Sequence, residues 1–378
     1  MAVSTPEFLL RLIVFVLVFD LSSVAVNLAQ FVVLPLALVP ATKLIYRLCI
    51  RESQRLWVTC MLSVLALLSP VELVLTGDWE AWRTDSLHPG DSVVIANHQI
   101  YTDWMYLWAW AHLRNAHGDV KIVLKRSLRN IPVVGWGMQF FEFIFLKRKW
   151  AEDRDELVSS LERARRDPLP TELIFFPEGT VITSDTSEKS RSYHAKAGYP
   201  WEHPRFVLVP RITGLWTSLN ALRGQGTRTA TSTAGRSKAP LRHLYDCTIV
   251  YDGIKPGDCP YDKYPILDVF LKGTGPARVF IHVSRFEVAS IPGFTEAESR
   301  DSLEDGESRF SEWLLGRFQD KDKLIEHFHA TGQFVENPGR SLRIPVAPSL
   351  SDALKLVALI VTEAALAWLA FRAARSAW

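Results

Sequence analysis

The sequence predicts an α/β fold with a largely parallel central sheet flanked by helices, N-terminal membrane helices and a C-terminal apolar helix. Two observations lead to it. Short apolar runs, rich in β-branched and aromatic residues, recur between residues 72 and 290 and alternate with helical stretches, which is typical of parallel sheets. Long apolar stretches lie near both ends of the chain, and about 20 apolar residues span a bilayer.

Four regions are predicted along the chain. Residues 1–70 are N-terminal membrane-embedded segments, 71–290 form the α/β domain, 291–348 form a peripheral helical region, and 349–378 form a C-terminal membrane helix. The 43 basic residues nearly balance the 41 acidic residues, so binding to nucleic acid through bulk charge is not expected. The four cysteines show no close pairing, so neither a disulfide framework nor a zinc signature is predicted.

The N-terminal region contains two apolar runs. Phe8–Val39 is long enough for one tilted helix or a shallow hairpin, and it fits a cleavable signal peptide poorly because a second run follows. This second run, Leu56–Leu68, is too short to span a bilayer by itself. It forms either a re-entrant or surface-lying helix, or the core of a longer span.

The C-terminal part of the chain predicts two further helices. Ala353–Phe371 is apolar but contains Lys355 and Glu363, so an amphipathic helix on the surface is the alternative to a membrane helix. Residues 298–330 are highly charged, with Phe310 and Phe318 at helical spacing, which predicts a peripheral amphipathic helix.

The central domain supplies the predicted sheet. The runs predicted as strands are residues 92–96, 120–124, 172–176, 205–209, 247–251 and 277–283. Helices are predicted at Asp103–Ala116 and Trp150–Arg166. Residues 223–240 are biased toward Gly, Ser, Thr and basic residues, and we expect a surface loop there.

A histidine and an aspartate lie five apart where the first of these strands ends, in the sequence IANHQIYTDW. Chemistry in α/β sheets gathers at the carboxyl ends of strands. Asn97 can brace the turn, and Asp103 can hold one ring nitrogen of His98 so that the other acts as a base. The alternative is a solvated loop histidine beside a helix-capping aspartate. The aromatic residues from Trp104 to Trp110 suit a site that opens toward lipid, or else belong to the core.

A second polar motif, FFPEGT, follows another predicted strand. Pro177 and Gly179 flank Glu178 and predict a tight, shaped loop. Glu178 is suited to pair with a guanidinium or to accept a hydrogen bond from a substrate hydroxyl, although a simple strand-ending turn is the alternative.

The nucleophile is expected to come from the substrate. The sequence has no Gly-x-Ser-x-Gly elbow, and Cys247 and Cys259 have no evident histidine partner, so a covalent triad is not predicted. The remaining option is a substrate hydroxyl, deprotonated by His98, that attacks an activated acyl group directly.

Together these motifs resemble the glycerolipid acyltransferase family, membrane enzymes that acylate lysophosphatidate and lysophospholipids from acyl-CoA. NHQIYTDW looks like the first family motif and FFPEGT like the third. The stretch Val123–Trp150 is similar to the second, with Arg148 at its basic position, and VLVPRITG at 207–214 is similar to the fourth. Blocks such as GWGMQ and FIFLKRKW resemble the branch that acylates lysophosphatidylinositol and lysocardiolipin.

The resemblance implies a reaction and its site. Acyl-CoA is the expected donor, a lysophospholipid is the expected acceptor, and no cofactor and no metal are expected. His98 and Asp103 are the expected catalytic residues. The expected substrate-binding residues are Asn97, Arg148, Glu178, Gly179, Thr180, Pro210 and Arg211. The protein is expected in the membrane of the endoplasmic reticulum, with the lipid bilayer and no nucleic acid as its partner.

Individual roles follow from side-chain chemistry. Arg148 and Arg211 are expected to grip the acceptor phosphate, because guanidinium groups bind phosphate in a bidentate way. Lys125, Arg126 and Lys196 are second candidates for this role, although for each of them taken singly a solvated surface charge is the favoured interpretation. The oxyanion of the reaction would be stabilised by Thr180 or by a loop N–H near Gly179.

Lysophosphatidylinositol is the leading acceptor, on the resemblance to that branch. The alternatives are an acyltransferase that makes phosphatidate from 1-acylglycerol-3-phosphate, and a membrane scaffold that binds lipid without chemistry. A metallohydrolase that uses His98, Asp103 and Glu178 would need further histidines for a catalytic zinc site.

Overall fold

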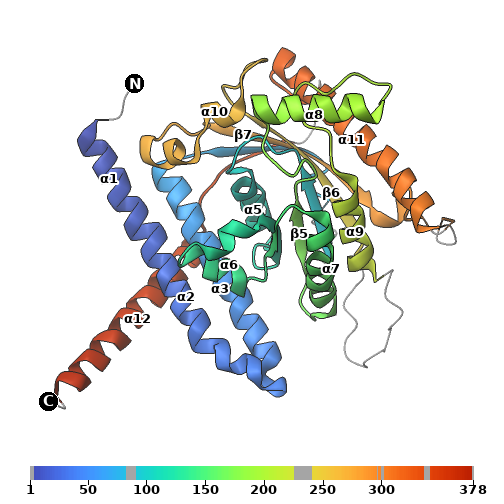
Figure 1. Ribbon diagram of the computed structural model, residues 1–378. Helices are drawn as coiled ribbons and strands as arrows, with labels where there is room; N and C mark the ends of the chain where they lie inside the picture. Colours follow the sequence, from blue (N-terminus) through green and yellow to red (C-terminus); the bar gives the residue numbers. More distant parts are fainter. Residues whose placement is uncertain are drawn as a thin grey trace.

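The computed structural model describes residues 4–81, 91–224, 241–295, 297–298, 302–335 and 341–376 (Figure 1). Within these ranges the strands form one eight-stranded sheet in the order β4-β3-β5-β2-β6-β7-β1-β8. The strands are β1 Glu72–Gly77, β2 Ser92–Ala96, β3 Val120–Lys125, β4 Ile144–Leu146, β5 Glu172–Phe175, β6 His243–Tyr251, β7 Arg278–Glu287 and β8 Leu342–Pro345. Most of the loop predicted at 223–240 lies outside the described residues.

The sheet is mixed, which corrects the prediction of a largely parallel sheet. Five neighbouring strands, β4, β3, β5, β2 and β6, are all parallel. Beyond them, β7 is antiparallel to β6, β1 is parallel to β7, and β8 is antiparallel to β1. The segment between β6 and β7 contains only short helices, and an antiparallel neighbour needs no crossover over the face of the sheet.

The run at 205–209 is not a strand, although its sequence predicts one. Val207 is fully buried, but no neighbouring strand pairs with it. The backbone of this segment bonds to side chains instead: the Phe206 N–H donates to Asp322 Oδ1 at 2.6 Å, and the Val209 N–H donates to Ser190 Oγ at 3.1 Å. Side chains on other elements therefore satisfy the polar groups that a strand ladder would otherwise occupy.

Helices cover both faces of the sheet (Figure 1). The helices of this part of the chain are α3 Lys43–Leu68, α5 Asp103–Leu113, α6 Val134–Phe140, α7 Trp150–Arg166, α8 Ser184–Ala197, α9 Ile212–Arg223, α10 Pro260–Lys263 and α11 Leu303–Thr331. Shorter helical turns are η3 Pro40–Thr42, η4 Arg126–Asn130, η5 Asp268–Lys272 and η6 Val288–Ser290. Along β2, Val94 packs on the side of α3 and α5, whereas Val93 and Ile95 pack on the side of α7, α9 and α11. This alternation is the side-chain period of a strand buried on both faces.

The first apolar run forms one continuous helical stretch. It comprises α1 Thr5–Phe15, the π-helical turn η1 Val16–Asp20, α2 Leu21–Val33 and the 3-10 turn η2 Leu34–Leu38. Among the helices that the structure describes, this stretch of 34 residues is the one that is long and apolar enough to cross a membrane. The single helix is therefore confirmed over the hairpin, and the membrane prediction has this one supporting helix.

The second apolar run belongs to the core. It is the last part of the long helix α3, Lys43–Leu68, and its side chains from Trp57 to Leu65 are mostly buried. The Trp57 ring stacks on that of Trp104 in α5, with centroids 6.1 Å apart. The prediction of several N-terminal membrane helices is therefore not supported for Leu56–Leu68, because the sheet and α5 cover the apolar side chains that lipid would otherwise cover.

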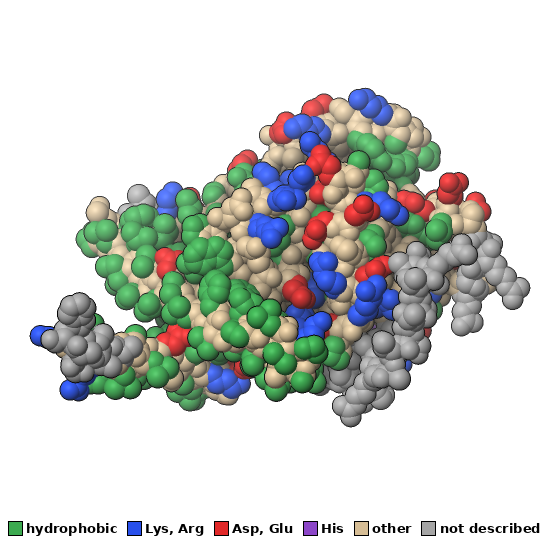
Figure 2. Space-filling view, turned by 60° about the horizontal axis from the view of Figure 1, so that its bottom comes forward, with side chains coloured by type: hydrophobic (Ala, Val, Ile, Leu, Met, Phe, Trp, Pro, Cys, Tyr) green, Lys and Arg blue, Asp and Glu red, His purple; other side chains and the backbone are tan. Residues whose placement is uncertain are grey.

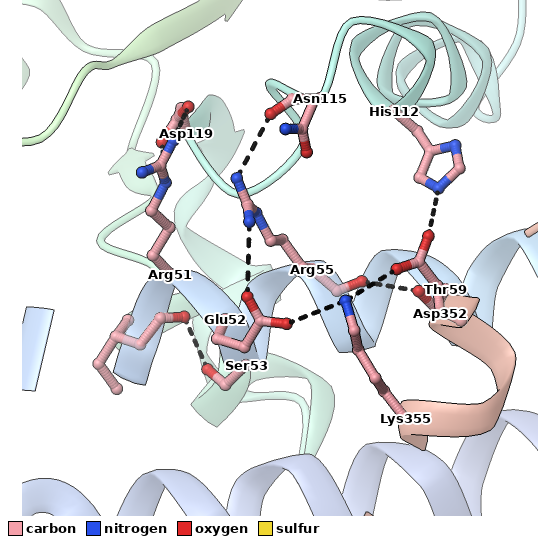
Figure 3. Close-up of polar contacts among 11 residues, drawn as sticks. Arg51, Glu52, Ser53, Arg55, Thr59, His112, Asn115, Asp119, Asp352 and Lys355 are labelled. Carbon is pink, nitrogen blue, oxygen red and sulfur yellow. Dashed lines mark hydrogen bonds and ion pairs between the residues drawn. The ribbon is translucent and has the colours of Figure 1, made fainter. Parts of the chain in front are cut away.

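The last helix, α12 Leu350–Ser376, is fixed to the body by its first two turns (Figure 3). His112 Nε2 lies 3.2 Å from Asp352 Oδ2, and Lys355 Nζ lies 4.0 Å from Glu52 Oε1 in α3. Beyond these turns, apolar side chains such as Val361 are exposed, and Figure 2 shows hydrophobic side chains gathered on the terminal helices. Insertion of α12 into a membrane stays a prediction.

A buried ion pair joins α11 to the sheet. Lys321 of α11 and Asp246 of β6 pair, with side chains 0% and 1% exposed, and Arg317 Nε also lies 2.9 Å from Asp246. Lys321 Nζ donates a further bond to the Cys247 carbonyl at 2.6 Å. The amphipathic helix predicted at 298–330 is therefore present, and it is linked to the strand beside β2.

We predict that Lys321→Ala destabilises the protein by about 3 kcal/mol, because loss of one partner leaves a buried carboxylate with less compensation. Arg317 stays in contact with Asp246 and keeps the loss from being larger. Lys323→Ala, an exposed position on the same helix, is the control and should change stability by under ~0.5 kcal/mol. Thermal unfolding of the purified protein measures both, and equal midpoints would contradict the role of the buried pair.

Candidate active site

The site begins where β2 ends, at Asn97. This residue is fully buried, and its side chain bonds to the backbone of β6 in both directions. Asn97 Nδ2 donates to the Ile249 carbonyl at 3.0 Å, and the Ile249 N–H donates to Asn97 Oδ1 at 2.8 Å. The structure thus gives Asn97 the bracing position that the sequence predicts, and it fixes the start of the next turn.

The turn brings His98 and Asp103 together. His98 Nδ1 lies 2.7 Å from Asp103 Oδ2, and the same oxygen accepts the backbone N–H groups of Gln99 at 2.6 Å and Ile100 at 3.1 Å. The other carboxylate oxygen accepts the Tyr251 hydroxyl. Asp103 is fully buried, and because it only accepts, it selects the imidazole tautomer with a proton on Nδ1.

The remaining ring nitrogen of His98 faces no hydrogen-bond partner among the described residues. The ring stacks on Phe176 with centroids 4.3 Å apart and planes at 22°, and the His98 side chain is 16% exposed. The imidazole is therefore held in orientation on one side by a carboxylate and on its face by an aromatic ring. Its Nε2 is free to take a proton from a substrate hydroxyl.

Glu178 lies beneath this turn and does not face solvent. Its Oε1 accepts the His98 backbone N–H at 3.2 Å, and the residue is 2% exposed. Burial raises the pKa of Glu178 well above its ordinary value of 4.5, and the charge of Asp103 raises it further, whereas N–H groups of His98 and Leu208 oppose the shift. Glu178 thus supports the backbone of the turn that carries His98, and its predicted contact with substrate stays a prediction.

The third and fourth motifs meet at Gly179. This residue has φ +72°, where a side chain is strained, and a Cβ there would lie 3.6 Å from Cδ of Arg211. The Arg211 N–H donates to the Pro177 carbonyl at 2.8 Å. Pro210 is buried and Arg211 is exposed, so the two motifs present a guanidinium over the loop that ends β5.

Arg148 lies at the same edge of the sheet, after β4, but the structure does not bring it into contact with His98. It is exposed, its φ is +66°, and no described acid lies within ion-pair distance of it. Lys125, Arg126 and Lys196 are also exposed. Thr180 is half-buried and follows the Gly179 turn.

Two features of the site differ from the expectation. Three of the four aromatic residues from Trp104 to Trp110 are core, since Tyr106 and Trp108 are fully buried and Trp110 is 1% exposed, so these three do not open toward lipid. Trp104 is half-buried. Tyr251 is a site residue that sequence reasoning did not single out. Its place at the end of a strand next to the first motif's strand was the available signal, but the pairing of β2 with β6 was needed to use it.

Comparison with known proteins agrees with this geometry. The protein-family model described as Acyltransferase matches residues 83–213, and the protein-family model described as Acyltransferase C-terminus matches residues 269–351. A 2-acyl-1-lysophosphatidylinositol acyltransferase of Saccharomyces cerevisiae is 33% identical over 360 residues, covering 83% of this chain and 82% of that relative. The chain belongs to the acyltransferase family. The resemblance seen in its four motifs is confirmed, and the protein is an acyltransferase.

Other relatives in this acyltransferase family carry different acceptor names. Lysocardiolipin acyltransferase 1 of Danio rerio is 30% identical over 303 residues, which cover 79% of this chain and 66% of that relative. A 1-acyl-sn-glycerol-3-phosphate acyltransferase 2 of Arabidopsis thaliana is 29% identical over 333 residues, which cover 86% of this chain and 75% of that relative. The first family model covers His98 and Asp103, and the second family model covers α11.

We predict that the Glu178→Gln variant is more stable than the wild type above pH 4.5, and that the difference in the free energy of unfolding grows as the pH rises. Below pH 4.5 the carboxyl is protonated in the folded and unfolded chains, so both proteins should be equally stable. Above it the unfolded chain ionises first, because the folded pKa is raised, and the wild type loses stability by about 1.4 kcal/mol per pH unit until the folded pKa is reached. Glutamine cannot ionise and escapes this loss.

Thermal unfolding between pH 4 and 9 measures this difference. Glu202→Gln removes a carboxylate from an exposed position and should follow the wild type throughout. A constant gap between wild type and Glu178→Gln at all pH values would show that burial does not raise the pKa of Glu178.

Proposed function

We propose that this acyltransferase moves an acyl group from acyl-CoA to the free glycerol hydroxyl of a lysophospholipid, with lysophosphatidylinositol as the leading acceptor. The observation that carries the proposal is the His98–Asp103 pair at 2.7 Å, which leaves one imidazole nitrogen free at the carboxyl edge of the sheet. The name of the yeast relative supports the choice of acceptor. A lipid-binding scaffold has no need of such a base.

The chemistry needs one base and no covalent enzyme intermediate. The acceptor hydroxyl gives its proton to His98 Nε2 while its oxygen attacks the thioester carbonyl. The carbon–sulfur bond then breaks, and the proton passes from the imidazolium to the leaving thiolate of coenzyme A. Asp103 stabilises the imidazolium and takes no proton itself. No metal is required for these steps.

Thr180 is the better candidate to stabilise the oxyanion. The Gly179 N–H donates to the Phe176 carbonyl at 3.0 Å and is thereby occupied. The Thr180 hydroxyl is half-buried and bonds to no other described residue. A preorganised donor beside a developing negative charge is often the largest single contribution to catalysis.

A second candidate acceptor follows from the relatives. The name of the yeast enzyme describes a 2-acyl acceptor with position 1 free, whereas the name of the Arabidopsis enzyme describes a 1-acyl acceptor with a terminal phosphate. 1-Acylglycerol-3-phosphate is therefore the alternative acceptor. The two differ both in head group and in the position of the free hydroxyl, so one panel of acceptors separates them.

The N-terminal helix supports a location in a membrane, which we propose is that of the endoplasmic reticulum. Phe15 of α1 packs on Phe270, with ring centroids 5.7 Å apart, and Arg11 Nη1 donates to the Leu68 carbonyl at 2.7 Å. Phe270 belongs to η5, downstream of β6, whose partner β2 leads to His98. Lipid around α1 would therefore lie near η5, the helical turn that follows β6, and β6 is the strand that pairs with β2.

The proposal predicts that His98→Ala lowers acyl transfer by about 10²–10⁴-fold, which is the usual contribution of a general base. Asp103→Asn should lose a large share of the same factor. The assay uses membranes containing the protein, labelled oleoyl-CoA, and lysophosphatidylinositol and lysophosphatidate with position 1 or position 2 free.

His327→Ala, which removes a histidine of α11, is the matched control for this assay and should keep wild-type activity. Near-wild-type turnover by His98→Ala at equal protein level would overturn the mechanism. Preference for 1-acyl lysophosphatidate would instead replace the leading acceptor by the alternative.

We further predict that Arg211→Ala and Arg148→Ala each raise the acceptor KM about tenfold and change the KM for acyl-CoA less. A hydrogen bond to a charged group contributes about 1.5–3 kcal/mol. Lysine at either position should rescue only in part, because an ammonium lacks the bidentate fork. Arg154→Ala, an exposed arginine on α7, is the control. An unchanged acceptor KM would remove that arginine from the phosphate site.

A further inference from the structure

A cleft of about 450 Å³ opens beside the catalytic turn. Gln99 and Ile182 line it and flank His98 closely, since Gln99 follows it in sequence and the Ile182 N–H donates to the His98 carbonyl at 3.0 Å. Tyr251, which donates to Asp103, also lines it. The other walls come from α8, from the segment before Pro210, from the loop after β6 and from the end of α11.

Three side chains with fixed positive charge line the cleft, namely Arg191, Arg205 and Lys255. Arg191 lies 3.5 Å from Glu188, and Arg205 lies 3.0 Å from Glu326. All four of these side chains are at least 60% exposed, so the pairs contribute little and can be exchanged for a ligand anion.

The third cation, Lys255, is exposed, and its ammonium has no acidic partner among the residues that the structure describes. The one acid that lines the cleft is Asp258. Its carboxylate accepts the Lys255 backbone N–H at 2.9 Å and lies 3.5 Å from Lys263 Nζ. The charge of Lys255 is thus available to a phosphate.

Uncharged polar groups complete the wall. His203 Nε2 lies 2.9 Å from Ser190 Oγ, and the His329 ring packs on Phe206 with centroids 5.0 Å apart. Burial lowers the pKa of both histidines from the ordinary value of 6.5, so at neutral pH they offer a neutral donor and acceptor. The hydroxyls of Ser184 and Ser187 add to this set.

We infer that this cleft binds a phosphorylated polyol belonging to one of the two substrates. The three cations fit phosphate, and the neutral histidines and serines fit ring hydroxyls. Two substrate groups share that chemistry: the phosphoinositol head of the acceptor and the 3′-phosphorylated ribose of coenzyme A. The inference rests on the proposed function. It gives the last turns of α11, which line the cleft, a direct part in substrate binding.

The test is the double variant Arg191→Ala/Lys255→Ala, assayed with two donors and two acceptors. The donors are oleoyl-CoA and oleoyl-3′-dephospho-CoA; the acceptors are lysophosphatidylinositol and lysophosphatidate. The KM of one substrate should rise about tenfold, as expected for lost charged hydrogen bonds, with kcat within about twofold. If the ribose binds here, the variant should no longer distinguish the donors. If inositol binds here, the variant should lose its preference between the acceptors.

Binding is also measured without catalysis. Coenzyme A or myo-inositol 1-phosphate should raise the unfolding temperature of the wild type and not that of the double variant, while both proteins unfold alike without ligand. Arg154→Ala is the control for a lost surface charge. Unchanged KM values together with equal ligand stabilisation would overturn the inference. A wild type that binds ligand through these residues but transfers no acyl group would instead overturn the proposed function alone.

Discussion

The buried carboxylate of Asp103 is the constraint on which the site depends. A carboxylate withdrawn from water must have its lone pairs satisfied, and here the ring of His98, two backbone N–H groups and the Tyr251 hydroxyl supply the donors. The same contacts fold the turn after β2 and orient the imidazole. Local structure and catalytic geometry therefore have one cause, and any change that removes Asp103 disturbs both.

The parallel half of the sheet presents the chemistry, and the rest of the fold holds that half in place. Strand β6 is the link, because it pairs with β2 on one side and with β7 on the other. Asn97 locks the catalytic turn to Ile249, while Lys321 of α11 pairs with Asp246 only a few residues earlier. Helix α11 thus acts on the position of the turn through a single strand.

Much of this could be predicted from sequence, because short-range spacing encodes it. The His98–Asp103 contact, the helix after it, and the strands before the first and third motifs follow from local patterns of apolar and polar residues. Contacts between distant segments were the part that could not be predicted. The sequence does not show that β7 returns antiparallel, that Tyr251 donates to Asp103, or that side chains instead of a strand satisfy the backbone around Val207. The aromatic residues after His98 illustrate the same limit, since helical periodicity does not distinguish a core from a lipid-facing surface.

Under the phosphate-binding role proposed for Arg148, folding and recognition make opposite demands on this residue. Its backbone has φ +66°, a region in which any residue except glycine is strained, and at functional sites such strain costs about 1–3 kcal/mol. Glycine at this position would relieve the strain and give a more robust protein, but it would remove the guanidinium from the rim of the sheet. Selection for thermal stability alone would therefore favour the loss of this arginine. An engineer who wants a hardier enzyme should look for stability elsewhere in the chain.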